Sequence, residues 1–135
     1  MSTWLILGGS SAMARALARA VAAQGDAVFP AGRDRGDLEA LATDCRLRGA
    51  REAEALTFDA RDPSGFDAIR QRMTQAKGPL NIAVFTGSMP PQPEIDDDPS
   101  LIDGVIKDSF TGPAQLITLL APHVEHTQGT EVGVG

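Results

Sequence analysis

Two glycines and two serines interrupt an apolar run near the start of the chain. The stretch Leu5–Arg15 reads Leu-Ile-Leu-Gly-Gly-Ser-Ser-Ala-Met-Ala-Arg, so an apolar segment ends at Gly8 and a helix-forming pattern follows. A strand that turns tightly into a helix N-terminus presents unpaired backbone N–H groups, which bind nucleotide phosphates. The N–H groups around Ser10–Met13 are therefore candidate phosphate ligands. The hydroxyls of Ser10 and Ser11 can add donors or simply cap the helix.

The rest of the chain alternates short apolar segments with longer helical patterns. Strands are predicted over Thr3–Leu7, Asp26–Ala31, Ala53–Phe58, Leu80–Phe85 and Thr130–Val134. Helices are predicted over Ser11–Gln24, Asp37–Arg48, Asp62 to Gly78-Pro79, and Leu101–His123 with a bend near Gly112-Pro113. This alternation predicts βαβ units and a parallel sheet. No repeat or linker divides the chain, so residues 1–135 are expected to form one α/β domain.

Helical spacing also predicts which side chains face the core. In the first helix these are Met13, Leu17, Ala20, Val21 and Gln24, and in the second Leu38, Leu41, Ala42 and Cys45.

Composition and charge narrow the classes of partner. The net charge is −6, and residues 78–135 carry one lysine, Lys107, against 8 of the 18 acidic residues. An acidic chain without a basic stripe argues against nucleic-acid binding, and no segment reaches the ~20 consecutive apolar residues of a membrane span. The chain starts with no secretory signal pattern, and Cys45 is its single cysteine. We therefore expect a cytoplasmic protein with an inert thiol.

Five short motifs, in order along the chain, resemble those of the short-chain dehydrogenase/reductase family. Gly8, Ala12 and Ala14 have the spacing of its glycine-rich turn, with alanine in the second and third glycine places. The later motifs are Ala31-Gly32-Arg33-Asp34 with Leu38-Glu39-Ala40-Leu41, Phe58-Asp59-Ala60-Arg61-Asp62, Leu80 to Gly87, and Ser109-Phe110-Thr111-Gly112-Pro113. The resemblance covers the whole chain. It implies a three-layer, Rossmann-like, doubly wound parallel sheet of five strands in the order 3-2-1-4-5, truncated relative to the family.

The resemblance also implies a nicotinamide dinucleotide cofactor. The implied contacts are Gly8, Ser10, Ser11, Ala12 and Met13 at the pyrophosphate, Arg33 at the ribose 2′ position, Asp59 at the adenine, and Thr86 and Gly87 at the adenosine ribose. An arginine at this ribose position suits the 2′-phosphate of NADP, whereas an acid would accept from the 2′-hydroxyl of NAD. We therefore expect NADP rather than NAD, with Arg35 able to assist.

Each of these contacts has a purely structural alternative. Arg33 could be a surface arginine paired with Asp34 or Asp37, Asp59 could cap the next turn, and Thr86-Gly87 could be an ordinary turn at a strand end. The methyl groups of Ala12 and Ala14 occupy places where glycine permits close approach of the backbone. They are expected to weaken cofactor binding or to shift the turn.

The residues that perform hydride transfer in the resembling family have no counterpart here. That family uses a Tyr-x-x-x-Lys pair and a serine after strand five, whereas this chain has no tyrosine and its lysines are Lys77 and Lys107. Ser109 also stands in the family's Asn place. No catalytic residue is therefore predicted. The chain is expected to be the NADP(H)-binding domain of an oxidoreductase, catalytically incomplete as given; the alternative is a non-catalytic nucleotide sensor or oligomerisation module.

Two polar clusters do not have the arrangement of a metal site. Asp96-Asp97-Asp98 are adjacent in a proline-rich segment and are typical of a surface loop whose last acid caps a helix. His123 and His126 lack a third converging ligand.

The segment Leu101–His123 predicts self-association. Its apolar residues exceed what one buried face requires, namely Leu101, Val105, Ile106, Leu116, Ile117, Leu119 and Leu120. In the resembling family the same helix packs against its counterpart in a dimer. We expect a homo-oligomer, a dimer or tetramer, formed through this region.

Overall fold

The computed structural model describes residues 2–8, 12–59, 61–76, 78–85, 112–127 and 131–133. Its strands are β1 (Thr3–Leu7), β2 (Ala27–Gly32), β3 (Leu56–Thr57), β4 (Leu80–Val84) and β5 (Glu131–Gly133). Its helices are α1 (Ala12–Ala23), α2 (Arg35–Arg48), α3 (Phe66–Thr74) and α6 (Gly112–Thr127), with a 3-10 turn, η1, at Pro63–Gly65. The predictions for Ser10, Ser11, Thr86, Gly87, Asp96-Asp97-Asp98 and the side chain of His126 lie outside the described residues.

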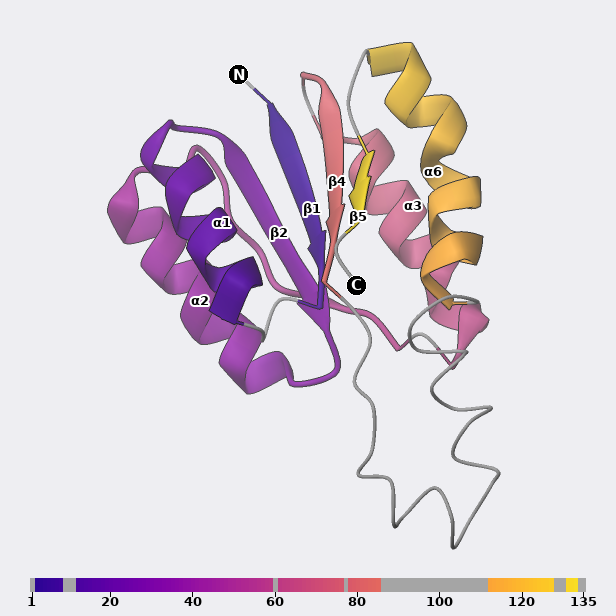
Figure 1. The fold of residues 1–135 in the computed structure, drawn as a ribbon, viewed down its shortest axis with the longest axis horizontal. Coiled ribbons are helices and arrows are strands. Elements are labelled where there is room, and N and C mark those ends of the chain that lie inside the picture. Colours follow the sequence, from indigo (N-terminus) through magenta and orange to yellow (C-terminus); the bar gives the residue numbers. More distant parts are fainter. Residues whose placement is uncertain are drawn as a thin grey trace, which may run out of the picture.

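The five strands form one parallel sheet in the order β3-β2-β1-β4-β5, which confirms the predicted topology (Figure 1). β1 is the central strand and pairs along its whole length with β2 and with β4, so that Leu5 lies opposite both Phe29 and Ile82. The strand order reverses at β1: the chain builds β2 and β3 on one side of it and then crosses to β4 and β5 on the other.

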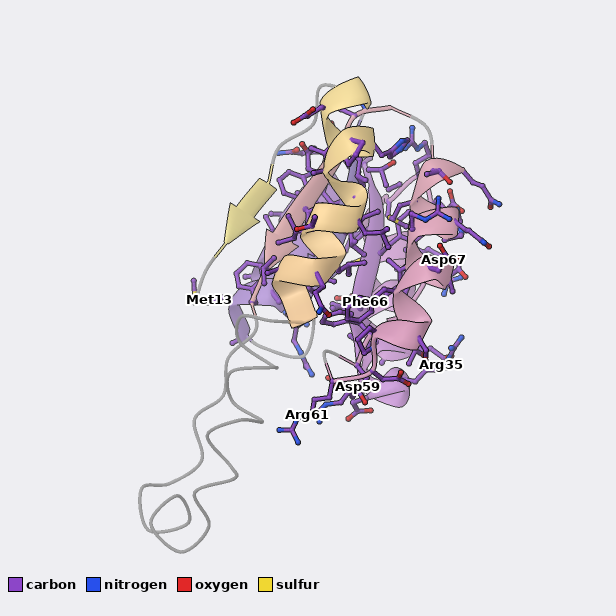
Figure 2. The ribbon with its side chains drawn as sticks, turned by 90° about the vertical axis from the view of Figure 1, so that its right-hand side faces the viewer. Met13, Arg35, Asp59, Arg61, Phe66 and Asp67 are labelled. Carbon is purple, nitrogen blue, oxygen red and sulfur yellow. The ribbon has the colours of Figure 1, made fainter. Side chains whose placement is uncertain are left out.

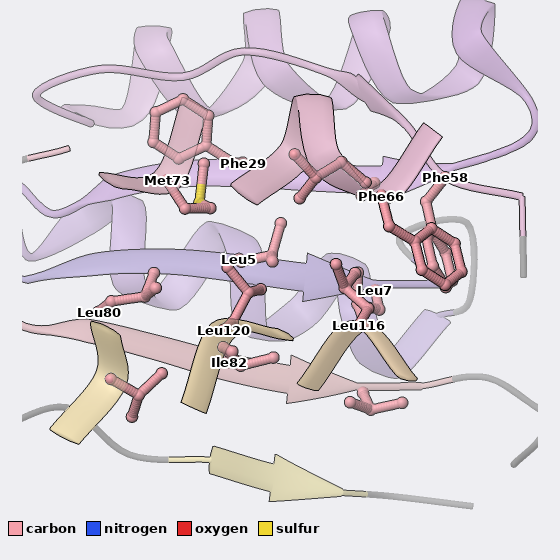
Figure 3. Close-up of a cluster of buried hydrophobic side chains, with 14 of the residues drawn as sticks. Leu5, Leu7, Phe29, Phe58, Phe66, Met73, Leu80, Ile82, Leu116 and Leu120 are labelled. Atoms are coloured by element: carbon pink, nitrogen blue, oxygen red, sulfur yellow. The ribbon is translucent and has the colours of Figure 1, made fainter. Parts of the chain in front are cut away.

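Helices cover both faces of this sheet. Successive residues of a strand point to opposite faces, so Leu5 and Leu7 pack into a cluster with α3 and α6, whereas Ile6 packs with α1 and α2. Figure 3 shows the first cluster, in which Leu116 and Leu120 of α6 lie over the strands. Because both faces are buried, β1 and β4 are almost entirely apolar, as a central parallel strand must be.

Local signals define the ends of α2. The Asp34 side chain caps its N-terminus by accepting from the Asp37 backbone N–H, and Gly49 ends it in the left-handed conformation with φ of 118°. The predicted inner face of Leu38, Leu41, Ala42 and Cys45 is buried, as expected. The helix starts two residues earlier than predicted, at Arg35.

The predicted inner face of α1 is wrong in part. The buried residues are Ala14, Ala18, Val21 and Ala22, whereas Met13 is 61% exposed. Ala20 and Gln24 are also exposed, and Leu17 packs against the cluster at its edge. Three alanines let the helix approach the sheet closely, so the helix presents its small side chains to the strands rather than its larger ones.

The third strand is shorter than the predicted Ala53–Phe58. Only Leu56–Thr57 lie in the ladder, and Ala53 forms an isolated bridge with Val28. Val28 N donates to Glu52 O at 2.8 Å, but the next residue of β2 that would donate to this side is Pro30, which has no N–H. Pairing resumes at Ala31, opposite Leu56, and the Gly32 carbonyl accepts from Phe58 N at 2.9 Å.

The remaining strands lie within one residue of the predicted bounds at each end. Of the predicted helix Leu101–His123, residues 101–111 lie outside the described residues, and α6 runs four residues past the predicted end. Asp62 caps the 3-10 turn that precedes α3, and Phe66, Ile69 and Met73 are buried at the predicted helical spacing. Among the described helices, none is long and apolar enough to cross a membrane.

The burial of the Cys45 thiol leads to a prediction about how the free energy of unfolding depends on pH. Burial and the neighbouring Asp44 carboxylate raise the pKa of Cys45 above its ordinary value. The folded state therefore holds the thiol proton more tightly than the unfolded chain, and this contribution to stability is lost as the pH rises above about 8.5. Urea unfolding at pH 7.5 and pH 10 should show a larger loss of stability for the wild type than for Cys45→Ala. Equal losses of unfolding free energy in the two proteins would contradict a raised pKa of Cys45.

Candidate functional site

The carboxyl ends of the parallel strands meet at one edge of the sheet, and most of the described candidate residues lie there. Gly8 follows β1, Arg33 follows β2 and Asp59 comes two residues after β3. Backbone hydrogen bonds hold this edge together: Gly8 N donates to Ala31 O at 2.9 Å, and Phe85 N donates to Leu7 O at 2.8 Å. In Figure 2 Met13, Asp59 and Arg35 lie along the same end of the molecule. This edge, at the strand-order reversal, is where ligands bind in open α/β sheets.

The turn after β1 begins with a glycine in a conformation that other residues rarely adopt. Gly8 has φ of 81°, which directs the chain away from the strand toward the start of α1. Ala12 and Met13 in the first turn of α1 are both exposed, so their N–H groups, which have no partner within the helix, lie at an accessible helix end. The helix terminus also carries a partial positive charge that favours an anion.

The two alanines in glycine places differ in their surroundings. Ala14 is fully buried where α1 packs on the sheet, in the same cluster as Ile6, so its methyl group belongs to the core. Ala12 is exposed at the helix start, so its methyl group does not fill the helix–sheet contact. The methyl group of Ala14 is therefore accommodated in the core, whereas Ala12 is exposed at the start of α1.

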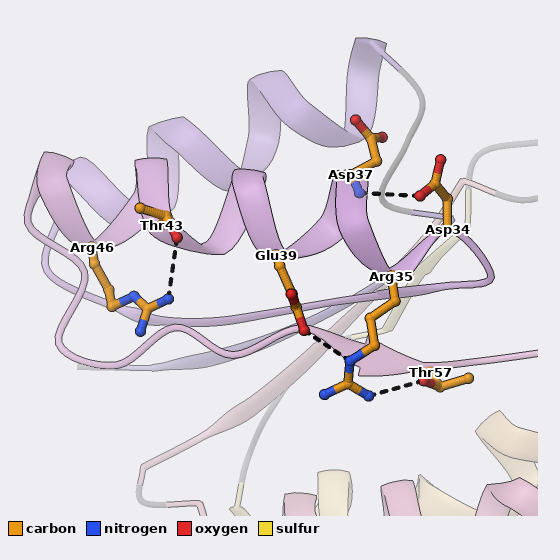
Figure 4. A network of polar contacts seen from close by, with 7 residues as sticks. All are labelled: Asp34, Arg35, Asp37, Glu39, Thr43, Arg46 and Thr57. Carbon is orange, nitrogen blue, oxygen red and sulfur yellow. Dashed lines mark hydrogen bonds and ion pairs between the residues drawn. The ribbon is translucent and has the colours of Figure 1, made fainter.

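Arg33 is exposed and has no hydrogen bond or ion pair to any residue that the structure describes. The two carboxylates proposed as its structural partners are engaged elsewhere. Asp34 Oδ1 accepts from Asp37 N at 3.1 Å, and the Asp37 carboxylate accepts from Arg15 (the cap is drawn in Figure 4). The structure therefore favours a guanidinium available to a ligand over one paired with its neighbours.

Arg35 is committed to other contacts. Its Nε donates to Glu39 Oε1 at 2.9 Å, and its Nη1 donates to Thr57 Oγ1 at 3.3 Å (Figure 4). The bond to Thr57 fastens the first turn of α2 to β3, whereas the bond to Glu39 lies within α2. These two bonds engage Nε and Nη1 and hold the Arg35 side chain toward Glu39 and Thr57.

The Asp59 side chain makes the hydrogen bond expected if it caps the next turn, which is the structural alternative to a contact with adenine. Its Oδ1 accepts from the Arg61 backbone N–H at 3.0 Å, which closes a turn directly after the third strand. The side chain is half-buried at the same edge of the sheet as Gly8 and Arg33. A role toward an adenine ring stays a prediction.

The polar groove between α1 and α2 was not singled out in the sequence. It is lined by Arg15, Arg19, Asp37, Ala40, Leu41, Asp44 and Arg48. Arg19 and Arg48 both bond to Asp44, at 2.9 and 3.1 Å, and these two hydrogen bonds lower the pKa of Asp44. The partners on α1 and α2 are more than 20 residues apart, so the sequence pattern gives no signal for them.

The described residues offer no alternative chemical centre. They contain no group of three His, Cys, Asp or Glu side chains that could hold a metal ion. His123 lies near the C-terminal end of α6, which Figure 1 places at the end of the sheet opposite the turn after β1. In α6, Leu116 and Leu120 are fully buried and Leu119 is 40% exposed. Self-association through this region stays a prediction.

Comparison with known proteins agrees with this geometry. The sequence model described as short chain dehydrogenase matches residues 2–135. The chain belongs to this family. No curated protein matches the sequence.

Solved structures of the family share the fold. A 3-ketoacyl-ACP reductase from Sinorhizobium meliloti 1021 is 27% identical with a TM-score of 0.83, covering 98% of this chain and 53% of that one. A short-chain dehydrogenase from Sphingobium yanoikuyae in complex with NADPH is 25% identical with a TM-score of 0.76, covering 100% and 53%. An alcohol dehydrogenase from Thermococcus sibiricus complexed with 5-hydroxy-NADP shares the fold at 17% identity, a TM-score of 0.81, and coverage of 98% and 57%. This short-chain dehydrogenase domain thus spans about half the length of these structures.

The turn closed by Asp59 can be tested without a ligand. Asp59→Ala removes the acceptor of the Arg61 N–H and should lower the free energy of unfolding by about 1 kcal/mol. Asp59→Asn keeps an acceptor oxygen and should lose less than half of that. Urea denaturation of the wild type and the two variants measures these free energies. Equal destabilisation by both substitutions would contradict the hydrogen bond from Arg61 N to Asp59.

Proposed function

We propose that this short-chain dehydrogenase domain binds NADP(H) at the carboxyl edge of its sheet, as the cofactor-binding part of an oxidoreductase. The observation that carries the proposal is the state of Arg33. It stands directly after β2, exposed and without a partner among the described residues, while Asp34 and Asp37 are both engaged. A planar guanidinium of this kind is suited to a forked, charge-assisted contact with a phosphate.

The described residues around Arg33 fit such a cofactor. The pyrophosphate would lie against the N–H groups that open α1, after the turn at Gly8, and the 2′-phosphate would lie against Arg33. The serines predicted at the turn would add hydroxyl donors, with Asp59 at the adenine and Thr86 and Gly87 beside the adenosine ribose. When bound, the cofactor supplies the hydride that an oxidoreductase transfers.

The proposed role of this chain is to bind and orient the cofactor. No catalytic residue is assigned within it, because its 135 residues include no tyrosine to act as the proton donor of the family's Tyr-x-x-x-Lys pair. The complexes with NADPH and 5-hydroxy-NADP among the solved structures support the proposed cofactor class. Substrate reduction would require groups beyond those assigned here.

Substitution of Arg33 tests this proposal. Arg33→Gln should weaken NADP binding about 10- to 100-fold, since a hydrogen bond to a charged group contributes roughly 1.5–3 kcal/mol. It should leave NAD binding unchanged within about twofold, because NAD lacks the 2′-phosphate. Isothermal titration calorimetry with both nucleotides measures the two affinities.

The matched control for this experiment is Arg46→Gln, which removes one positive charge from the last turn of α2, the helix that begins two residues after Arg33. It should bind both nucleotides like the wild type. If the wild type binds NAD more tightly than NADP, the NADP assignment is wrong. If it binds neither nucleotide, the oligomerisation module becomes the better account.

A further inference from the structure

An ion pair joins the start of α1 to the start of α2. Arg15, the fourth residue of α1, donates through Nη2 to the Asp37 carboxylate in the first turn of α2. The two side chains are 35% and 30% exposed, so the pair is shielded in part from solvent. Among the described residues, Asp37 is the one acceptor of the Arg15 guanidinium. The Nε atom of Arg15 is buried and has no partner among them.

Asp37 connects this pair to the backbone beside Arg33. Its N–H donates to the Asp34 carboxylate at 3.1 Å, and Asp34 O accepts from Leu38 N at 3.1 Å. Asp34 directly follows Arg33, so the cap that starts α2 also fixes the chain direction at Arg33. Arg15, Asp37 and Asp34 thus form one connected series from the helix that follows the phosphate turn to the proposed 2′-phosphate ligand.

The negative charge of Asp37 also affects the proposed contact between Arg33 and the 2′-phosphate. Its carboxylate lies four residues after Arg33, in the first helical turn beyond it. An uncompensated carboxylate in this turn would repel a phosphate bound by Arg33, and the repulsion would be screened only in part at distances up to about 8 Å at physiological ionic strength. The guanidinium of Arg15 compensates that charge.

Resting on the NADP binding proposed above, we infer that Arg15 is a positioning residue for cofactor choice. Its pair with Asp37 neutralises a carboxylate in the first turn of α2 and holds that turn, which begins two residues after Arg33, against the start of α1. By cancelling the negative charge of Asp37, Arg15 therefore favours NADP over NAD without contacting the reacting part of the cofactor.

The neighbouring ion pair supplies a matched control. Arg19 lies one turn after Arg15 on α1 and pairs with Asp44 at 2.9 Å across the same groove. Arg19→Gln removes the same charge from the same helix, but about 6 Å farther from the phosphate turn along the helix axis. Loss of this pair tests the general effect of charge and of the contact between α1 and α2.

The experiment measures the affinities of NADP and NAD for four variants by calorimetry, with urea unfolding to confirm that each is folded. Arg15→Gln should lower the NADP-to-NAD affinity ratio about fivefold, as expected for one partly screened charge. Asp37→Asn should raise the ratio, and the double variant should return it to within about twofold of the wild type because the charge balance is restored. Arg19→Gln should leave the ratio within about twofold of the wild type.

Two results would overturn the inference. Equal weakening of both nucleotides by Arg15→Gln would show that the pair only stabilises the fold, as would an equal drop in the ratio with Arg19→Gln. If Arg15→Gln does not fold, an unchanged ratio in Asp37→Asn overturns it instead. Arg33→Gln distinguishes failure of the positioning role from failure of the proposed function. If Arg33→Gln leaves the NADP-to-NAD affinity ratio unchanged, both the proposed function and the positioning role are contradicted. If Arg33→Gln changes the ratio but Arg15→Gln and Asp37→Asn do not, only the positioning role is contradicted.

Discussion

The pairing of β1 with a parallel neighbour on each side is the constraint on which the rest of the structure depends. A strand in the centre of a parallel sheet has both faces buried, and Leu5, Ile6 and Leu7 are accordingly fully buried between two helical layers. The chain must then leave β1 at its carboxyl end through a turn between the two directions in which the sheet grows. Gly8, with its positive φ, makes that exit possible. The candidate site therefore lies at this edge because of the sheet's topology.

The close approach of α1 to the sheet ties the site to the core. Ala14, Ala18 and Ala22 face the strands and leave room for the helix to pack tightly, which fixes where its N-terminus lies relative to the end of β1. α2 is fixed differently, through the Asp34 cap, the Arg35 contacts to Glu39 and Thr57, and the ion pair between Arg15 and Asp37. An apolar contact thus sets one end of the site and a polar network the other, and the pair between Arg15 and Asp37 links the two.

Much of this could be predicted from the sequence because the signals are local. Continuous apolar runs predicted β1 and β4, and Asp62 and Gly49 marked a helix start and a helix end. The third strand was predicted too long because the cause of its interruption, Pro30, lies on the neighbouring strand. The inner face of α1 was predicted from helical spacing with Met13 on it, whereas the close approach of the helix to the sheet favours alanine there. The pair between Arg15 and Asp37 spans 22 positions, so only the folded chain brings it together.

We propose that the turn after β1 binds the pyrophosphate of NADP and that Arg33 binds its 2′-phosphate. The most direct test is a titration of the ¹⁵N-labelled protein with NADP, followed by amide chemical shifts. The account predicts the largest shifts at Gly8, Ala12, Met13 and Arg33, and a clear reduction of the Arg33 shift when NAD replaces NADP. Shifts confined to other parts of the chain, such as α6, or no shifts at millimolar NADP, would contradict it.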